Sequence, residues 1–196
     1  LLLKKISGSY TANLPKQREQ TTILKAPESL PAAQVAHKLW MAGSVGSGKT
    51  SAIQTLTQGN SVSTEVKPSD QAGLKKVSTT VAMDFGSCWI DQDTQVRLYG
   101  SPGQRRFDFM GEVLLKNAKG LAIMIDNQLS DAFTELDYYL NHYSDFLVKS
   151  PAVIGVTHND LSPKPSVKEY ARFLQSRNSN WPVLKVDARR YADMEK

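Results

Sequence analysis

Residues 43–50 have the types and spacing needed to bind phosphate. They read Gly-Ser-Val-Gly-Ser-Gly-Lys-Thr and match the pattern G-x-x-x-x-G-K-[ST] without a gap. The glycines allow the backbone to wrap closely around an anion with its N–H groups pointing inward, and a following helix adds the positive end of its dipole. In such a loop Lys49 reaches the β- and γ-phosphates, and the Thr50 hydroxyl binds Mg²⁺. The residues that we expect to contact a nucleotide here are Gly43, Ser44, Val45, Gly46, Ser47, Gly48, Lys49, Thr50 and Ser51.

The flanks of this loop have the context that the pattern requires. Residues 39–42 are an apolar run suited to a strand, and residues 51–56 can continue as a helix. The alternative is a glycine-rich turn that matches the pattern by chance. The strand, loop and helix order favours the phosphate site.

The elements around this loop alternate between strand and helix patterns from residue 37 onwards. We predict strands at 37–42, 81–85, 95–99, 120–125, 151–156 and 181–186. Helices are predicted up to residue 58, over 107–117, along the apolar spacing of 133–147, after the capping box at 166–169, and briefly before residue 196. Residues 60–76 are polar and predict a long mobile loop. The alternation predicts an α/β domain with a mainly parallel sheet of six strands.

Length and composition suit one globular domain. The chain has 196 residues, 40% hydrophobic and 22% charged, and a net charge of +5 without a dense Lys/Arg run, so nucleic acid is not an expected partner. The single Cys88 excludes an internal disulfide framework. We expect a cytoplasmic protein with a domain at 37–196. Residues 1–36 are expected to be a flexible extension whose apolar start at 1–6 is a candidate for peripheral membrane contact.

Two segments beside predicted strands could respond to the γ-phosphate. Thr80 precedes the 81–85 strand and can bind Mg²⁺ when the γ-phosphate is present, with Thr79 as the nearby alternative. Gly103 and Gln104 follow the 95–99 strand, where a glycine N–H can meet the γ-phosphate and a glutamine can orient water. Taken alone, each segment could equally be an ordinary strand start or turn.

Two further loops could read a base. The segment Thr157, His158, Asn159 and Asp160 follows the 151–156 strand, and the Asp160 carboxylate can accept two N–H bonds from guanine that adenine cannot donate. A buried acceptor left unpaired costs about 1–3 kcal/mol, which is enough to discriminate between bases. Ala188 and Arg189 follow the last strand, where a backbone N–H can meet guanine O6.

In this order the four loops resemble those of the Ras-like small GTPases. Residues 80–85 resemble the T-I-G-V-D-F segment of Rab-type members, 103–107 resemble G-Q-E-R-F, and 187–189 resemble S-A-[KR]. More narrowly, the chain is similar to prokaryotic predicted GTPases related to the bacterial polarity and gliding-motility switch, at residues 79–86, 96–104, 107–110 and 155–158. The resemblance implies the P-loop NTPase fold in three α/β/α layers, GTP or GDP with Mg²⁺ as ligands, and a roadblock-type regulator or activating protein and an effector as partners.

The chain departs from the Ras-like pattern at several positions. Gly100 stands where relatives carry the Asp that supports Mg²⁺ through water. We expect Asp84 not to replace that Asp, because it lies four residues beyond Thr80, about 13 Å along a strand. Asp126 is expected to brace its loop instead. Val45 fills a position that is Gly in many relatives and could crowd Gln104, so we expect slow intrinsic hydrolysis.

The sequence leaves three classes of function open. The first is a GTP-hydrolysing switch in which Gln104 and Lys49 are catalytic, Thr50 and Thr80 bind the metal, and an arginine comes from a partner or from Arg105 or Arg106. The second is a nucleotide-binding scaffold without significant hydrolysis. The third, a P-loop kinase or ATPase, is disfavoured by Gln104 and Asp160.

Overall fold

A seven-stranded sheet runs through the molecule. The computed structural model describes residues 35–63, 83–105, 111 and 115–196. Its strands are ordered β2-β3-β4-β1-β5-β6-β7 across the sheet. Their bounds are β1 Val35–Ala42, β2 Ser61–Ser63, β3 Asp84–Trp89, β4 Thr94–Gly100, β5 Ala118–Asp126, β6 Ala152–Thr157 and β7 Val183–Lys185. Strands β4, β1, β5, β6 and β7 are parallel, and β2 and β3 add an antiparallel edge.

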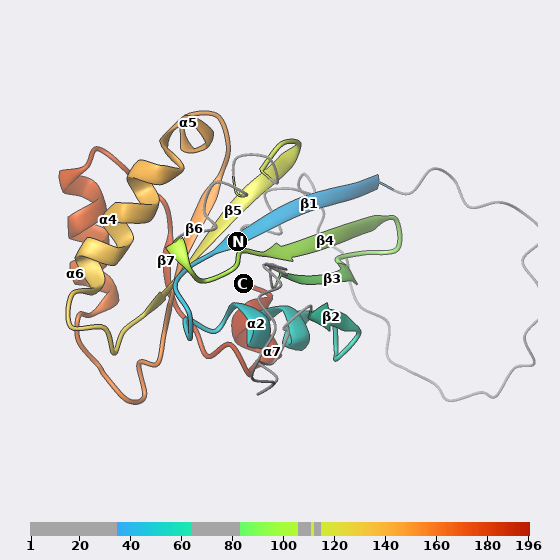
Figure 1. The fold of residues 1–196 in the computed structure, drawn as a ribbon, viewed down its shortest axis with the longest axis horizontal. Coiled ribbons are helices and arrows are strands. Elements are labelled where there is room, and N and C mark those ends of the chain that lie inside the picture. The colour runs from blue at the N-terminus through green and yellow to red at the C-terminus, as the bar shows by residue number, and fades with distance from the viewer. Residues whose placement is uncertain (1–34, 64–82, 106–110, 112–114) are drawn as a thin grey trace, which may run out of the picture.

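Helices cover both faces of the sheet. Helices α2 (Lys49–Leu56) and α7 (Tyr191–Met194) lie together on one side, while α4 (Ala132–His142), α5 (Ser144–Leu147) and α6 (Val167–Ser176) lie on the other (Figure 1). The predicted three-layer α/β/α P-loop architecture is therefore confirmed.

The two faces of β1 explain why both layers form. Successive strand residues point to opposite faces, and β1 is apolar on both of them. Trp40 and Ala42 are buried with the residues under α4 and α6, whereas Leu39 and Met41 are buried with Ile53 and Leu56 of α2. Such a strand is stable only at the centre of a sheet that is covered on both sides, so the loop that follows β1 emerges at the middle of the domain.

The helix on the far side of the sheet begins as the sequence predicts. The Ser166 hydroxyl accepts a hydrogen bond from the Glu169 N–H, and the Glu169 side chain accepts one from the Ser166 N–H, which completes a capping box at the start of α6. The segment predicted as one helix over 133–147 is divided at Tyr143 into α4 and α5. Arg177, at the end of α6, forms an ion pair with Asp137 of α4.

Three sequence predictions need correction. The sheet has seven strands instead of six, because residues 61–63, predicted to lie in a long loop, pair with β3 as a short edge strand. Strand β3 runs to Trp89, so residues 86–89, predicted as a connection, are part of the sheet. The connection between β3 and β4 is therefore a short turn at residues 90–93. The Asp91 carboxylate stabilises this turn by accepting hydrogen bonds from the Asp93 and Thr94 N–H groups.

Some predictions lie outside the described residues. These are the extension at 1–34, most of the loop at 60–76 and most of the helix predicted at 107–117. Strand β1 begins at Val35, two residues before the predicted domain boundary. Across the described part of the chain, no helix has the length and apolarity required to cross a bilayer.

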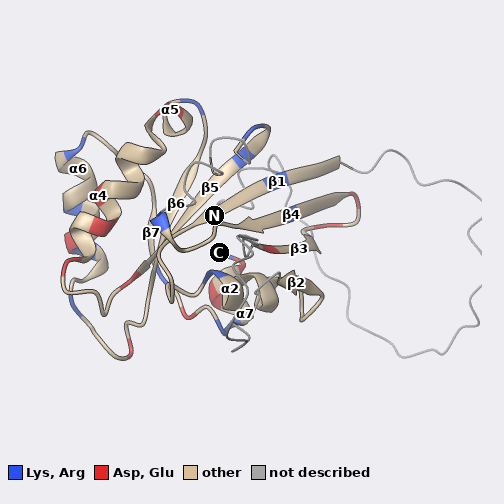
Figure 2. Cartoon of the chain, in the orientation of Figure 1, with Lys and Arg blue, Asp and Glu red and all other residues tan. Residues whose placement is uncertain are grey.

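Charge is distributed over the helices and loops. Figure 2 shows both signs on the outer helices and connections, while the central strands are largely uncharged. This pattern follows from burial, because an unpaired charge inside the sheet layers would be costly to desolvate.

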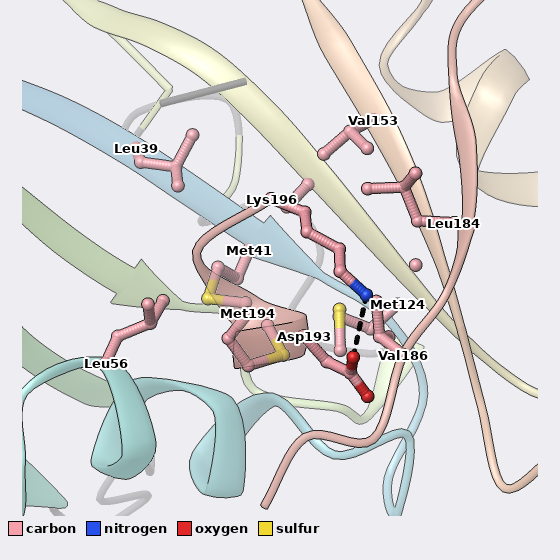
Figure 3. A pocket seen from close by; sticks show the side chains of 12 residues that line it. Leu39, Met41, Leu56, Met124, Val153, Leu184, Val186, Asp193, Met194 and Lys196 are labelled. Carbon is pink, nitrogen blue, oxygen red and sulfur yellow. Dashed lines mark hydrogen bonds and ion pairs between the residues drawn. The ribbon is translucent and has the colours of Figure 1, made fainter. Parts of the chain in front are cut away.

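An apolar pocket lies between the sheet and α7, away from the glycine loop. It is lined by Leu39, Met41, Leu56, Met124, Val153, Leu184, Val186 and Met194, and the ion pair between Lys196 and Asp193 lies at it (Figure 3). Most of these side chains belong to the core on that face of the sheet. The pocket has no phosphate-binding or base-reading residues.

We expect truncation of the α4 core contact to destabilise the domain strongly. Leu136 is fully buried against the sheet. Leu136→Ala should lower the free energy of unfolding by about 2–5 kcal/mol, measured by urea denaturation, because it leaves a cavity. Val148→Ala is the control, since that side chain is 83% exposed and should change stability by less than about 0.5 kcal/mol. Equal effects of the two substitutions would contradict this assignment of the core.

Candidate nucleotide-binding site

The glycine loop between β1 and α2 has a backbone that side chains would obstruct. Gly43, Gly46 and Gly48 have φ angles of 149°, 84° and 91°. A Cβ at Gly43 would lie 2.3 Å from the Met124 carbonyl oxygen and 2.5 Å from the Ser47 hydroxyl. Gly48 is the N-cap of α2 and has no side chain that could cap the helix, so no N-cap side chain occupies the N–H groups of the first turn. The loop thus has the backbone of an anion cradle at a helix N-terminus.

Lys49 is held inside this loop. It is buried, and its ammonium group donates hydrogen bonds to the Gly43 and Ser44 carbonyl oxygens at 2.8 and 2.7 Å. The loop carbonyls therefore fix the position of the cation where the cradle forms. A phosphate in the cradle would meet a positive charge that is already placed.

Asp84 lies beside Thr50. The Thr50 hydroxyl donates a hydrogen bond to Asp84 Oδ2 at 2.5 Å, and the Asp84 residue is buried. The sequence expectation considered only the distance along the strand from Thr80 and did not anticipate this contact. That Asp84 does not support Mg²⁺ stays a prediction. Asp84 is the first residue of β3 and pairs across the sheet with Gly100, the last residue of β4, so its carboxylate reaches the start of α2 from the neighbouring strand.

The turn after β4 contacts the glycine loop through its backbone. The Val45 N–H donates a hydrogen bond to the Gly103 carbonyl at 3.1 Å. A Cβ at Gly103 would lie 2.5 Å from Val45 N and 2.8 Å from Ser44 C, so only glycine fits there. The neighbouring Gln104 is exposed, and the Val45 side chain is 68% exposed. Gly103 thus lies against the phosphate loop, while the role of Gln104 and its expected crowding by Val45 stay predictions.

One pocket joins the glycine loop to both predicted base-reading loops. It is lined by Gly46, Gly48, Ser51, Thr157, His158, Asp160, Leu161, Asp187, Ala188 and Arg189. These residues come from three separate strand ends: β1, β6 and β7. Parallel strands place their carboxyl ends at the same edge, so residues as far apart in sequence as Gly46 and Arg189 meet there. Of the predicted contacts, Gly46, Gly48, Ser51, Thr157, His158, Asp160, Ala188 and Arg189 all line this pocket.

Buried hydrogen bonds fix the positions of these loops. The Thr157 hydroxyl lies 3.2 Å from the Ser47 carbonyl oxygen and 3.1 Å from that of Ile125, so it joins β6 to the glycine loop. The Thr55 hydroxyl donates to the Ala188 carbonyl at 2.7 Å. These bonds connect the phosphate and base parts of the pocket through protein atoms before any ligand is present.

His158 is directed by Asp126. Its backbone is left-handed, with φ of 52°, and Nδ1 lies 2.8 Å from Asp126 Oδ1. Asp126 also accepts a hydrogen bond from the Gln128 N–H. Asp126 therefore braces this loop, as expected.

Arg189 links the two base-reading loops. Its guanidinium donates to both oxygens of Asp187 at 2.8 Å and lies 3.6 Å from Asp160 Oδ2. These hydrogen bonds lower the pKa of Asp187 to about 2. Asp160 and Arg189 are 61% and 71% exposed, so the Asp160 carboxylate is accessible to a ligand.

The Arg105 side chain contacts two residues of α4. Its guanidinium forms an ion pair with Glu135 of α4 at 2.7 Å and lies 4.1 Å from the centre of the Tyr138 ring. A role for this arginine at a phosphate would require that pair to break. Thr79, Thr80 and Arg106 lie outside the described residues, so their suggested roles stay predictions.

The sequence interpretation missed several supporting residues. Asn127 and Tyr170 form a buried pair beneath the base-reading loop: the Tyr170 hydroxyl donates to Asn127 Oδ1 at 2.9 Å, and the Asn127 amide donates to the Ser162 and Pro165 carbonyls. Burial and the charge of Asp126 raise the pKa of Tyr170 to about 12. The sequence indicates Asp187 only as part of the segment 187–189 and gives it no role of its own. No local spacing marks Asn127 and Tyr170, because they are 43 positions apart and come from different elements.

We expect the Asp187 titration to report the Arg189 contact. In the native protein the carboxyl group should titrate near pH 2, so the stability that this ionised group provides is present above about pH 4 and is lost as the pH falls to about 2. Arg189→Ala removes the two side-chain hydrogen bonds and should raise the pKa of Asp187 toward its ordinary value of 3.8. Carboxyl ¹³C shifts measured by NMR give both values.

Arg190→Ala is the matched control for this titration. Arg190 acts on Asp187 only as a weaker, more distant charge, so its removal should move the pKa much less. An unchanged Asp187 titration in Arg189→Ala would contradict the assigned contact.

Comparisons with known proteins give one sequence relative and one structural match of interest. No family model matches the chain. The uncharacterized protein MJ1339 of Methanocaldococcus jannaschii is 31% identical over 90 residues, which span 45% of this chain and 50% of that protein. The chain therefore matches about half the length of that curated relative.

The structural match is the G domain of the T. maritima FeoB iron transporter. It superimposes with a TM-score of 0.54 and 19% identity, over 78% of this chain and 88% of that domain. At this identity the match speaks for the fold alone. Together with the glycine loop and the sheet order, it shows that the chain has the fold of a P-loop G domain.

Proposed function

We propose that this protein binds GTP with Mg²⁺ and slowly hydrolyses it to GDP as a molecular switch. The observation that carries the proposal is the single pocket in which the glycine loop meets the loops of Asp160 and Arg189. A phosphate cradle alone would suit any nucleoside triphosphate. The adjoining carboxylate adds a group that favours guanine.

The phosphate end would be held by the glycine loop and Lys49. The Lys49 ammonium is already fixed beside the loop carbonyls, so it can neutralise phosphate charge with little reorganisation. Mg²⁺ prefers oxygen ligands, and the Thr50 hydroxyl would offer such an oxygen at the loop. When bound, the ion would neutralise charge that develops on the phosphates.

Asp160 would recognise the guanine base of the bound nucleotide. Guanine presents two N–H donors to a carboxylate, and adenine lacks this pair on its corresponding edge. The Arg189 guanidinium contacts both Asp187 and Asp160, and its contact with Asp160 is the longer one at 3.6 Å, so a base that binds Asp160 competes only with this weak contact. Thr157 and Asp126 hold this loop in place and do not themselves need to touch the base.

The switch itself would involve the contact between Val45 and Gly103. The Val45 N–H belongs to the phosphate cradle, and it now donates to the Gly103 carbonyl. A γ-phosphate that competes for this N–H would shift the turn that carries Gln104. An effector, and a roadblock-type regulator or activating protein, would respond to this change, and Gln104 would orient the attacking water.

A second candidate function is a nucleotide-binding scaffold without significant hydrolysis. The observation that favours it is the ion pair of Arg105 with Glu135 of α4. This pair holds the guanidinium of Arg105 against α4, so it is not available to a phosphate. The two candidates differ in whether any partner produces hydrolysis.

We expect GTP to bind about 5- to 150-fold more tightly than ATP in a competition experiment. The estimate follows from the cost of about 1–3 kcal/mol for leaving the Asp160 acceptor unpaired. Asp160→Ala should reduce the GTP preference while leaving ATP affinity nearly unchanged. The exposed Asp145 of α5 provides the control variant Asp145→Ala, which should bind both nucleotides like the native protein. Equal affinities of the native protein for GTP and ATP would exclude the proposed role of Asp160.

We expect Gln104→Ala to slow single-turnover GTP hydrolysis by about 100-fold, the typical cost of a misplaced reacting group. GTP affinity should change little, because the side chain is exposed beside the phosphate loop. Gln92→Ala, in the exposed turn between β3 and β4, is the control. Hydrolysis that proceeds equally in both variants, with or without a partner, would rule out the role of Gln104. Tight GTP binding without hydrolysis under any partner would favour the scaffold.

A further inference from the structure

We infer that Glu135, on α4, is a positioning residue that acts through Arg105 on the turn of Gln104 and weakens the binding of GTP relative to GDP. The inference rests on the proposed function and deepens it with a residue outside the nucleotide pocket. Glu135 is not among the residues that line this pocket, so its effect on a nucleotide has to pass through Arg105.

Gln104 lies between two residues that are each held by another element. Before it, the Gly103 carbonyl accepts a hydrogen bond from the Val45 N–H at 3.1 Å. After it, the Arg105 guanidinium lies 2.7 Å from Glu135 Oε2. Consecutive Cα atoms are only about 3.8 Å apart, so the backbone between the two contacts is short. A movement of the turn at Gln104 therefore disturbs the contact of Gly103, that of Arg105, or both.

Two side chains of α4 fix the Arg105 guanidinium. Glu135 accepts a charged hydrogen bond from it, and the guanidinium also lies over the Tyr138 ring, 4.1 Å from the ring centre. Glu135 and Tyr138 are three positions apart and so share one face of the helix. A single hydrogen bond would leave the long arginine side chain free to turn about it, whereas the second contact limits this freedom. Helix α4 thus holds the end of the Arg105 side chain in one place.

The Glu135 carboxylate depends on this arginine. Its side chain is 11% exposed, against 56% for Arg105. Within the part of the chain that the structure describes, its Oε1 is buried without a hydrogen-bond partner, and Arg105 is the cation in ion-pair contact with its Oε2. A buried carboxylate with a single charged partner becomes costly when that partner leaves. The pair therefore resists a displacement of the turn more than a fully exposed ion pair would.

The state that this pair stabilises is the one without a γ-phosphate. The Val45 N–H belongs to the phosphate cradle and is occupied by the Gly103 carbonyl. The γ-phosphate of GTP would have to displace this carbonyl to reach the N–H, whereas GDP has no γ-phosphate and would leave the contact in place. A ligand shifts an equilibrium only by its difference in affinity for the two states. A contact that holds the turn therefore lowers the affinity for GTP and leaves the affinity for GDP nearly unchanged.

The alternative role of the pair is structural, a contact that only fastens residue 105 to α4. Both roles predict a lower Tm when Glu135 is changed. Only the positioning role predicts a change in the ratio of GTP affinity to GDP affinity. The experiment therefore measures this ratio together with thermal stability.

The test compares the Kd of GDP with that of a non-hydrolysable GTP analogue, so that hydrolysis does not affect the result. Glu135→Gln keeps the shape of the side chain and an acceptor but removes the charge that holds Arg105. The affinity for the analogue relative to GDP should rise about 5- to 150-fold, the usual range of coupling between two sites. The affinity for GDP alone should change little.

Asp137→Asn is the matched control. Asp137 lies on the same helix and forms an ion pair with Arg177 at the end of α6. The substitution removes a carboxylate charge from an ion pair, as Glu135→Gln does, but at a contact that does not involve the turn at Gln104. It should lower thermal stability and leave the affinity ratio at its native value.

A double variant tests whether Glu135 acts through Arg105. Arg105→Ala alone should raise the affinity ratio, because it releases the turn from α4. Adding Glu135→Gln to a protein that already lacks the arginine should raise the ratio no further, since the two residues act as one unit. Additive effects of the two substitutions would mean that Glu135 acts by another route and would overturn the inference.

The affinity ratio also decides the remaining outcomes. A native ratio in Glu135→Gln, with or without lower stability, would assign the pair a structural role only, and a lower ratio would mean that it favours the GTP state instead. If Glu135→Gln does not fold, Arg105→Ala makes the same test at the exposed partner, and an unchanged or lower ratio there overturns the inference. A native protein that binds neither GDP nor the analogue would fail the proposed function itself, and this failure is seen before any variant is compared.

Discussion

The structure depends on the close approach of backbone to backbone around residues 43–50. The loop presses against the Met124 carbonyl on one side and against Gly103 on the other, with no room for a Cβ at either contact. These contacts are possible because β1 is at the centre of the sheet, between β4 and β5, and is buried on both faces. The central strand thus delivers the loop to a point that the ends of its neighbours can reach.

From this point the rest of the site is built by short polar contacts between strand ends. Thr157 joins the loop of β6 to Ser47, and Thr55 joins α2 to Ala188 after β7. Asn127 and Tyr170 support the same region from beneath. Each bond is buried or partly buried, where hydrogen bonds between protein groups are not weakened by competing water. The walls of the pocket are therefore held together by contacts within the protein.

The position of Asp84 illustrates how paired strands share space. The first residue of β3 and the last residue of β4 are direct partners near the start of α2, and they are aspartate and glycine. A Cβ at Gly100 would lie 3.2 Å from Asp84 Cβ, so the glycine leaves room for the Asp84 side chain beside Thr50.

The sequence by itself determined the phosphate loop, the α/β alternation, the capping box of α6 and the order of the candidate loops. These features are local: glycine spacing, apolar periodicity and a cap each involve residues within a few positions of one another. The short edge strand β2 escaped prediction because its polar residues form a strand only when β3 is beside them.

Only the tertiary structure decided which residues meet. It placed Asp84 at Thr50, Asp126 at His158, Arg189 between Asp160 and Asp187, and Arg105 on Glu135. Each pair except the one between Arg189 and Asp187 joins residues at least 29 positions apart. Distance along the chain did not reveal the contact of Asp84 with Thr50, because hydrogen-bonded strands bring residues together across the sheet, about 5 Å apart whatever their separation in sequence.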